Sequence, residues 1–243
     1  MCYNKGKKGG GYMRIGIFTD AHYSSQTLSC GKRFNSQSFK KMQRAYDFFS
    51  EKRCELIVCL GDLIDTEPTA KREIENLRAI ATILHSSPIP TVCVMGNHDA
   101  FVMTPQDFYS ALDLQPPRDV YRHNCNLIFL DACYFKSGAH YAPGDSDWRD
   151  SYLPDEEDLQ RRLGNAEGKT YLFLHQNIDP SIKKDYRIGN ADAIAKILCQ
   201  SGKDITVFQG HYHKGAESQQ DGITYITLPA MCESENGFWI FDL

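Results

Sequence analysis

Residues 205–215 read ITVFQGHYHKG. An apolar, strand-like run at 205–209 is followed by a glycine and then by His211 and His213, which are two residues apart. On its own the pattern also fits a polar loop, because short histidine patterns occur often by chance. The rest of the sequence decides between these two interpretations.

Four other apolar runs end in the same way. RIGIF (14–18) leads into TDAH, ELIVCL (55–60) into GD, TVCVM (91–95) into GNHD, and TYLFL (170–174) into HQ. Five of the eight histidines of the chain fall at these five strand ends. Ligands of open α/β sheets bind outside the carboxyl ends of the strands, so the five ends can converge on one crevice.

Helical patterns separate the early strands. Apolar residues recur at spacings of three and four over 36–53 and 69–86, and shorter helices are expected at 155–163 and 190–200. Further strands are expected at 126–131, 223–228 and 237–241. This alternation predicts an α/β fold with a central sheet covered by helices. The last two strands leave no room for a helix between them, so we expect a mixed sheet with antiparallel strands in the C-terminal half.

The segment 134–153 is the longest stretch without periodicity. Loops of this length are uncommon unless they are functional or disordered. Its aromatic residues Tyr134, Tyr141 and Trp148 form either a structural cluster or a surface that overhangs the site and stacks on a base.

The composition is that of a globular protein with no strong charge. The chain has 243 residues, a net charge of -4 and 42% hydrophobic residues. The small negative net charge does not indicate binding to nucleic acid or to an acidic membrane. None of its nine cysteines forms a CxxC pair, and there is no secretory signal or bilayer-spanning apolar run. We therefore expect a cytoplasmic protein without a membrane or nucleic-acid partner. Residues 1–12 are expected to be a flexible extension.

Seven side chains at the strand ends are potential metal ligands: Asp20, His22, Asp62, Asn97, His175, His211 and His213. Carboxylate, carboxamide and imidazole groups suit first-row divalent metals, and the absence of thiolate argues against a structural zinc site. Seven donors are too many for one ion with an open position, but they suit two ions that share a bridging carboxylate. Two such ions, about 3.5–4 Å apart, form a clamp for displacement at phosphorus. The sequence therefore predicts phosphoester hydrolysis.

The order of these motifs resembles the calcineurin-like metallophosphoesterase superfamily. D-x-H, G-D-x-x-D, G-N-H-D, a lone histidine after a strand, and G-H-x-H follow one another from Asp20 to His213. The resemblance implies a four-layer αββα sandwich with mixed sheets around a dinuclear metal site. It also implies that residues 13–243 form the metallophosphoesterase domain.

The resemblance also implies a role for each site residue. One metal would be held by Asp20, His22 and His213, and the other by Asn97, His175 and His211. Asp62 would bridge the two metals. His98 would contact the phosphate and protonate the leaving oxygen, oriented by the carboxylate of Asp65, and Asp99 would have a supporting role.

Departures from the pattern narrow the choice within the superfamily. Thr66 follows Asp65 where protein Ser/Thr phosphatases have arginine, and the third motif reads GNHD rather than GNHE. FLHQNID, GHYH and the ending ITLPAMCESENGFWIFDL look more like the cyclic-nucleotide phosphodiesterase and the ADP-ribose or CDP-alcohol pyrophosphatase-like members.

We therefore expect a phosphodiesterase or pyrophosphatase that acts on a small, nucleotide-like substrate with two divalent ions, manganese, iron or zinc. A nuclease, with a basic groove, and a phosphomonoesterase, with a narrow arginine-lined pocket, stay as alternatives. A non-catalytic scaffold is disfavoured because no ligand of the motif set is missing. The sequence does not predict the oligomeric state.

Overall fold

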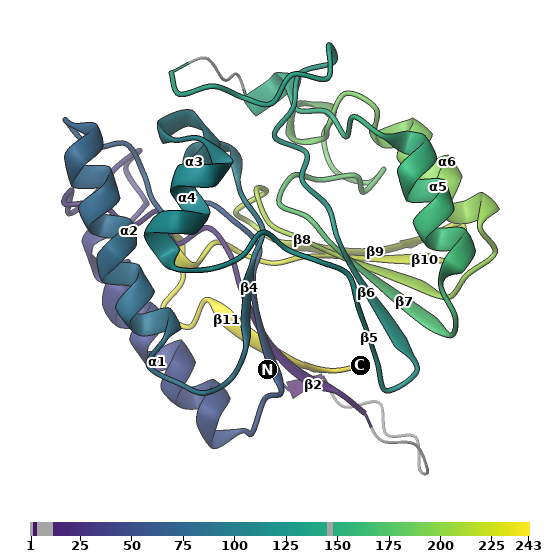
Figure 1. The fold of residues 1–243 in the computed structure, drawn as a ribbon, viewed down its shortest axis with the longest axis horizontal. Helices are drawn as coiled ribbons and strands as arrows, with labels where there is room; N and C mark the ends of the chain where they lie inside the picture. Colours follow the sequence, from purple (N-terminus) through teal and green to yellow (C-terminus); the bar gives the residue numbers. More distant parts are fainter. Residues whose placement is uncertain (1, 4–11, 145–147) are drawn as a thin grey trace.

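Two β-sheets face each other at the centre of the molecule (Figure 1). The structure is a computed structural model that describes residues 2–3, 12–144 and 148–243. Most of the predicted extension, 1–12, therefore lies outside the described residues. Cys2 and Tyr3 pair with the last strand of the chain, and the domain boundary at Met13 stays a prediction.

The first sheet joins the N-terminal strands to the end of the chain. In spatial order its strands are β1 (Cys2–Tyr3), β11 (Phe238–Asp242), β2 (Arg14–Phe18), β3 (Leu56–Cys59) and β4 (Thr91–Cys93). Strands β2, β3 and β4 are parallel to one another, whereas β11 is antiparallel to β2.

The second sheet comes from the C-terminal half. In spatial order its strands are β5 (Val120–Arg122), β6 (Cys125–Phe129), β7 (Lys169–Phe173), β8 (Ile205–Gln209), β10 (Ile223–Thr227) and β9 (Ala216–Gln220). The four inner strands are parallel, and the edge strands β5 and β9 are antiparallel to their neighbours. Both sheets are mixed, as predicted.

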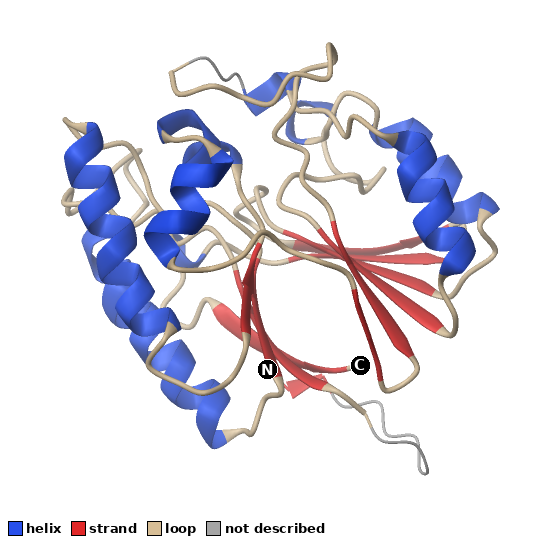
Figure 2. Ribbon diagram, in the orientation of Figure 1, coloured by secondary structure: helices blue, strands red, loops and turns tan. Residues whose placement is uncertain are grey.

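Helices cover only the outer face of each sheet (Figure 2). The first sheet is covered by α1 (Ser38–Glu51), α2 (Ala70–Leu84), α3 (Asn97–Val102) and α4 (Pro105–Leu112). The second is covered by α5 (Glu156–Asn165) and α6 (Ala191–Gln200). Single 3-10 turns lie at η1 (Asn35–Gln37), η2 (Trp148–Asp150), η3 (Lys184–Tyr186) and η4 (Met231–Glu233).

Strand periodicity explains the layering, because successive side chains point to opposite faces of a sheet. On β2, Ile15 and Ile17 pack between the two sheets, while Phe18 packs beneath the helices of the first sheet. On β7, Phe173 packs between the sheets and Leu172 packs under α5 and α6. Each strand therefore contributes to two apolar layers.

The architecture is the four-layer αββα sandwich that the resemblance implied. The residue pattern alone predicted one central sheet, and the structure corrects this expectation: the last two predicted strands, β10 and β11, lie in different sheets. The four predicted helices are present within a few residues of their expected bounds. Within the described residues, no helix is long and apolar enough to cross a membrane.

The described part of the loop 134–153 packs on the protein. Tyr141 is buried among the side chains between the first sheet and its helices, with its ring centroid 4.7 Å from that of Phe135. Tyr134 packs edge-on against His140. Residues 145–147 and the side chain of Trp148 lie outside the described part. The structural alternative for Tyr134 and Tyr141 is therefore the one that the structure favours.

Candidate metal centre

The predicted convergence of strand ends is present in the structure. Asp20 and His22 follow β2, Asp62 follows β3, Asn97 begins α3 after β4, and His175, His211 and His213 follow β7 and β8. Asp20, His22 and His175 are fully buried, and Asp62 is 1% exposed. All seven predicted ligands therefore come from the carboxyl ends of five strands that belong to both sheets.

Three of the seven side chains form a first group. His213 Nε2 lies 3.2 Å from Asp20 Oδ1, and His22 Nε2 lies 3.2 Å from His213 Nε2 and 3.7 Å from Asp20 Oδ1. Asp62 lies beside this group, and its Oδ2 is 3.5 Å from His22 Nε2.

A second group lies on the other side of Asp62. His175 Nε2 is 3.1 Å from Asp62 Oδ2 and 3.2 Å from Asn97 Oδ1. His211 joins them, because its ligand atom lies within 4.8 Å of those of Asp62 and His175. Asp62 thus stands between two sets of donors, in the position that a bridging carboxylate would occupy.

The backbone is strained at four of these seven residues. Asp20, His22, Asp62 and His211 have φ angles of 53°, 45°, 52° and 65°. The left-handed region is uncommon for non-glycine residues and costs of order 1–3 kcal/mol each. Such strain is typical of functional sites, because the surrounding structure must hold the side chains in place.

Two glycines allow the loops to approach each other closely. A Cβ atom at Gly96 would lie 2.2 Å from Asp62 Oδ1, and one at Gly210 would lie 2.1 Å from Thr19 Oγ1. Any larger residue would therefore displace the carboxylate or the loop that carries Asp20.

The donor set fits two divalent cations. Protonated imidazoles would repel one another at the 3.2 Å that separates His22 Nε2 from His213 Nε2. Neutral imidazoles and carboxylates, in contrast, are ligands for first-row divalent ions. Burying two carboxylates in this way is unfavourable unless positive charge compensates them.

The pKa shifts favour the ligand forms of most of these groups. Burial acts to raise the pKa of Asp20 and Asp62, but the neighbouring histidines hold both well below their ordinary values. Burial lowers the pKa of His22 to about 4 and that of His211 to about 3. His175 and His213 are the exceptions: although burial opposes both shifts, the charge of Asp62 raises the pKa of His175 to about 9, and Asp20 raises the pKa of His213 above its ordinary value.

His98 and Asp65 lie side by side next to His22 and Asp62. His98 Nδ1 is 3.1 Å from Asp65 Oδ1, and the backbone N–H of His98 donates to Asp62 Oδ1. Arg33 and Asn35 hold the other oxygen of Asp65, at 3.3 and 3.2 Å. Burial acts to lower the pKa of His98, but Asp62 and Asp65 raise it above the ordinary value.

Asp99 supports the loops that carry the site. Its Oδ1 accepts hydrogen bonds from the backbone N–H groups of Leu63 and Ile64, and its Oδ2 accepts one from Gly96. Burial and the charge of Asp62 raise the pKa of Asp99 to about 7. The side chain connects the loop after β3 to the loop after β4.

A cavity of about 220 Å³ opens over this centre. Its lining includes five of the site residues discussed above: Asp62, Asn97, His98, His211 and His213. The other lining residues are three basic side chains and two tyrosines: Lys32, Arg33, Lys214, Tyr186 and Tyr212. Positive charge and two aromatic rings therefore surround the proposed metal ligands.

Sequence reasoning missed several residues at this site, among them Glu233 and Tyr186. Glu233 Oε1 lies 2.5 Å from His213 Nδ1 and 3.0 Å from Lys32 Nζ, and Tyr186 lines the cavity. Glu233 lies six residues after the end of β10, and Tyr186 ends the 3-10 turn η3. No local signal singles out Glu233, because the polar segment after 223–228 also contains Glu235.

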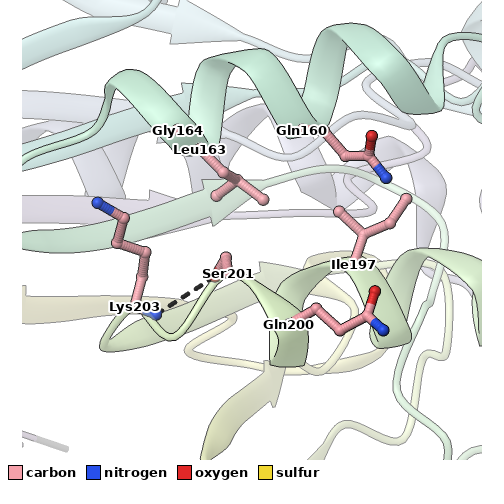
Figure 3. A pocket seen from close by; sticks show the side chains of 7 residues that line it. All are labelled: Gln160, Leu163, Gly164, Ile197, Gln200, Ser201 and Lys203. Atoms are coloured by element: carbon pink, nitrogen blue, oxygen red, sulfur yellow. Dashed lines mark hydrogen bonds between the residues drawn. The ribbon is translucent and has the colours of Figure 1, made fainter.

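A second cavity, of about 250 Å³, lies between α5 and α6 (Figure 3). Its seven lining residues are Gln160, Leu163, Gly164, Ile197, Gln200, Ser201 and Lys203. None of these seven is an acid, a histidine or a cysteine, and Lys203 Nζ donates to the carbonyl of Ala166. We therefore assign the chemistry to the cavity over the strand ends.

Comparison with known proteins places the chain in a family. A sequence profile described as calcineurin-like phosphoesterase matches residues 13–215. The chain belongs to the calcineurin-like phosphoesterase family.

Two relatives are identical to this chain at 24% and 22% of the aligned positions. A probable cyclic nucleotide phosphodiesterase of Psychrobacter arcticus is 24% identical over 242 residues, covering 91% of this chain and 81% of that protein. A probable cyclic nucleotide phosphodiesterase of Fibrobacter succinogenes is 22% identical, covering 95% and 85%.

Solved structures with the same fold include an enzyme and an anchor protein. A dimetal phosphatase from Danio rerio superposes with a TM-score of 0.77 at 16% identity, covering 95% of this chain and 92% of that one. The anchor in the inner membrane complex of Plasmodium superposes with a TM-score of 0.61 at 14% identity, covering 96% and 81%. At these identities the likeness shows the fold alone.

Proposed function

We propose that this protein hydrolyses a phosphodiester or pyrophosphate bond in a small, nucleotide-like molecule, using two divalent metal ions. The observation that carries the proposal is the arrangement of two donor groups on either side of Asp62, next to His98 and beneath a basic cavity. The family membership and the likeness to probable cyclic nucleotide phosphodiesterases support it.

The two donor groups define which residues would hold each ion. Asp20, His22 and His213 would hold one, Asn97, His175 and His211 would hold the other, and Asp62 would bridge them. When bound, the ions would polarise the phosphoryl oxygens and lower the pKa of water. Manganese, iron and zinc all accept these ligands.

His98 is the proposed general acid. Because its Nδ1 faces Asp65, its Nε2 is the nitrogen available to the substrate. A proton held at Nε2 passes to the leaving oxygen as the bond from that oxygen to phosphorus breaks. Arg33 holds Asp65 from the opposite side and so keeps this carboxylate in place.

The cavity supports a small anionic substrate. Its volume of about 220 Å³ is below the range of 300–1,000 Å³ typical of ligand pockets. Lys32, Arg33 and Lys214 can neutralise phosphate oxygens, and the rings of Tyr186 and Tyr212 offer flat surfaces for a base. The net charge of -4 disfavours the nuclease alternative.

Hydrolysis assays with two kinds of leaving group test the proposal. Bis-p-nitrophenyl phosphate and the pyrophosphates ADP-ribose and CDP-alcohols have weakly basic leaving groups, whereas cyclic nucleotides expel an alkoxide that needs a proton. We expect chelation to abolish hydrolysis and Mn²⁺ to restore it. His98→Ala should lower kcat on the second kind of substrate by about 10²–10⁴-fold and on the first kind far less.

The control variant is His123→Asn, in the turn between β5 and β6, which should keep full activity. Faster hydrolysis of p-nitrophenyl phosphate than of any diester or pyrophosphate would instead identify a phosphomonoesterase. Full activity after prolonged dialysis against excess chelator would contradict the proposal.

A further inference from the structure

Cys232 differs from the other buried cysteines of the described chain. Cys54, Cys59, Cys93, Cys125 and Cys133 all belong to the apolar clusters that form the layers of the fold. Cys232 is equally buried, at 0% exposure, but it belongs to none of the clusters among the described residues. A buried cysteine ordinarily packs as a small apolar side chain in such a cluster, and Cys232 lies outside all three.

Ligand groups and charged side chains lie near Cys232. Its sulfur and one ring nitrogen each of His22 and His213 all lie within 4.8 Å of one another. The charged groups that act on the thiol are those of Asp20, Arg33, Glu233 and Lys41. Two ligand atoms on one zinc ion lie roughly 3–4.5 Å apart, so the three atoms are close to the spacing of one metal site.

The backbone of Cys232 is fixed against the same loop. Its N–H donates to the carbonyl of Asp20 at 3.0 Å, and its carbonyl accepts from Lys41 Nζ and from the N–H of Phe34. The preceding Met231 donates to Thr19, and the following Glu233 holds the other ring nitrogen of His213. The turn η4 therefore places the sulfur beside the first donor group with little freedom to move.

We propose that Cys232 Sγ is a further ligand of the ion held by Asp20, His22 and His213, and that it makes this position selective for thiophilic ions. The inference rests on the proposed function, because it requires the metal centre. Binding forms one metal–sulfur bond, and the thiol proton is released to solvent. Zn²⁺ and Co²⁺ then gain a soft ligand that Mn²⁺ uses poorly.

Cobalt spectroscopy tests the proposal without measuring turnover. The protein is stripped with chelator and titrated with Co²⁺, while the bound metal is counted by elemental analysis. We expect a near-ultraviolet sulfur-to-cobalt charge-transfer band in the wild type and in Cys199→Ser, which changes an exposed cysteine on α6. The band should be absent from Cys232→Ser and Cys232→Ala.

Calorimetry on the same variants measures selectivity. Cys232→Ser should weaken Zn²⁺ binding at one site by about tenfold or more and change Mn²⁺ binding by less than about threefold. Circular dichroism checks that the variants fold, and the wild-type spectrum decides the question even if they do not.

Two results would overturn the inference in distinguishable ways. If two equivalents of Co²⁺ bind to the wild type without a charge-transfer band, or if the band survives in Cys232→Ser, sulfur is not a ligand and the metal centre stands. If no Co²⁺ binds to the folded wild type, the metal centre fails and the inference fails with it.

Discussion

Individual residues at the strand ends are held by their neighbours more tightly than their exposure alone implies. His213 is oriented by Glu233, Asp65 is fixed by Arg33 and Asn35, and Asp62 accepts a backbone hydrogen bond from His98. Contacts of this kind set which ring nitrogen or oxygen faces the centre of a site.

Glu233→Gln should weaken metal binding at the first donor group. The carboxylate next to His213 Nδ1 fixes the ring orientation and makes the opposite nitrogen more basic, and an amide does this less well. We expect a 10–100-fold rise in one dissociation constant for Zn²⁺, measured by calorimetry. Glu235→Gln, two residues away, is the control. Equal affinities in the two variants would exclude this role for Glu233.

Gly96→Ala should disrupt the centre by a steric route. The added methyl group would lie 2.2 Å from Asp62 Oδ1 and 2.4 Å from Asp62 N, so the proposed bridging carboxylate must move. We expect at least about a hundredfold loss of activity and about 1–3 kcal/mol less free energy of unfolding. Gly164→Ala is the matched control, because nothing from outside its own helix lies within 4 Å of the added Cβ. Wild-type activity in Gly96→Ala would show that the loop after β4 can adapt.

At the scale of elements, strands with clear apolar runs could be predicted and polar elements could not. The run ITVFQ identified β8, but the polar strand AESQQ, β9, shows no alternation of apolar residues and is held by pairing with β10. The helix α3 has the sequence NHDAFV, in which the polar motif residues form the first turn. Neither element shows an apolar periodicity that would mark it in the sequence.

The candidate site could be predicted from the same apolar runs that predicted the strands. Ligand-type side chains directly after an apolar run are visible in a sequence, and all seven converge in the structure. Glu233 and Cys232 could not be found in this way, because they lie several residues beyond β10 in a turn positioned by long-range hydrogen bonds.

The ion pair of His140 with Asp131 should make the stability of the loop 134–153 depend on pH. Burial acts to lower the pKa of His140, but Asp131, 3.2 Å away, raises it above the ordinary value. The folded pKa thus exceeds the unfolded pKa, about 6.5. The contribution to stability is complete below the unfolded pKa and is lost as the pH rises through the folded pKa.

Asp131→Asn should therefore lower the free energy of unfolding by about 1 kcal/mol at about pH 5.5 and by little at about pH 8.5. Urea unfolding at both pH values measures the difference. Glu75→Gln, which breaks the exposed pair with Arg72, should give the same small effect at both. A pH-independent effect of Asp131→Asn would contradict the assignment.

At the scale of the whole molecule, the two sheets meet so that the carboxyl ends of β2, β3, β4, β7 and β8 share one edge. The division into two sheets could not be derived from periodicity, because a strand buried on both faces has the same pattern in either arrangement. The two sheets were expected only from the order of the motifs, through the family resemblance. The candidate metal centre is therefore formed by residues from both halves of the chain.

Metal binding should therefore stabilise the entire fold. An ion that binds only the folded protein adds about 2.7 kcal/mol at a hundredfold excess over its dissociation constant. We expect Mn²⁺ to raise the unfolding temperature of the chelator-stripped protein, as measured by calorimetry. Asp62→Asn should lose most of this gain. An equal gain in wild type and Asp62→Asn would place the bound ions elsewhere.

The most direct test of the account is anomalous diffraction from crystals grown with Mn²⁺. The account predicts two neighbouring peaks, with Asp62 in contact with both. One peak should contact Asp20, His22 and His213, and the other Asn97, His175 and His211. Peaks at other residues, or a single ion without Asp62 as a ligand, would contradict it.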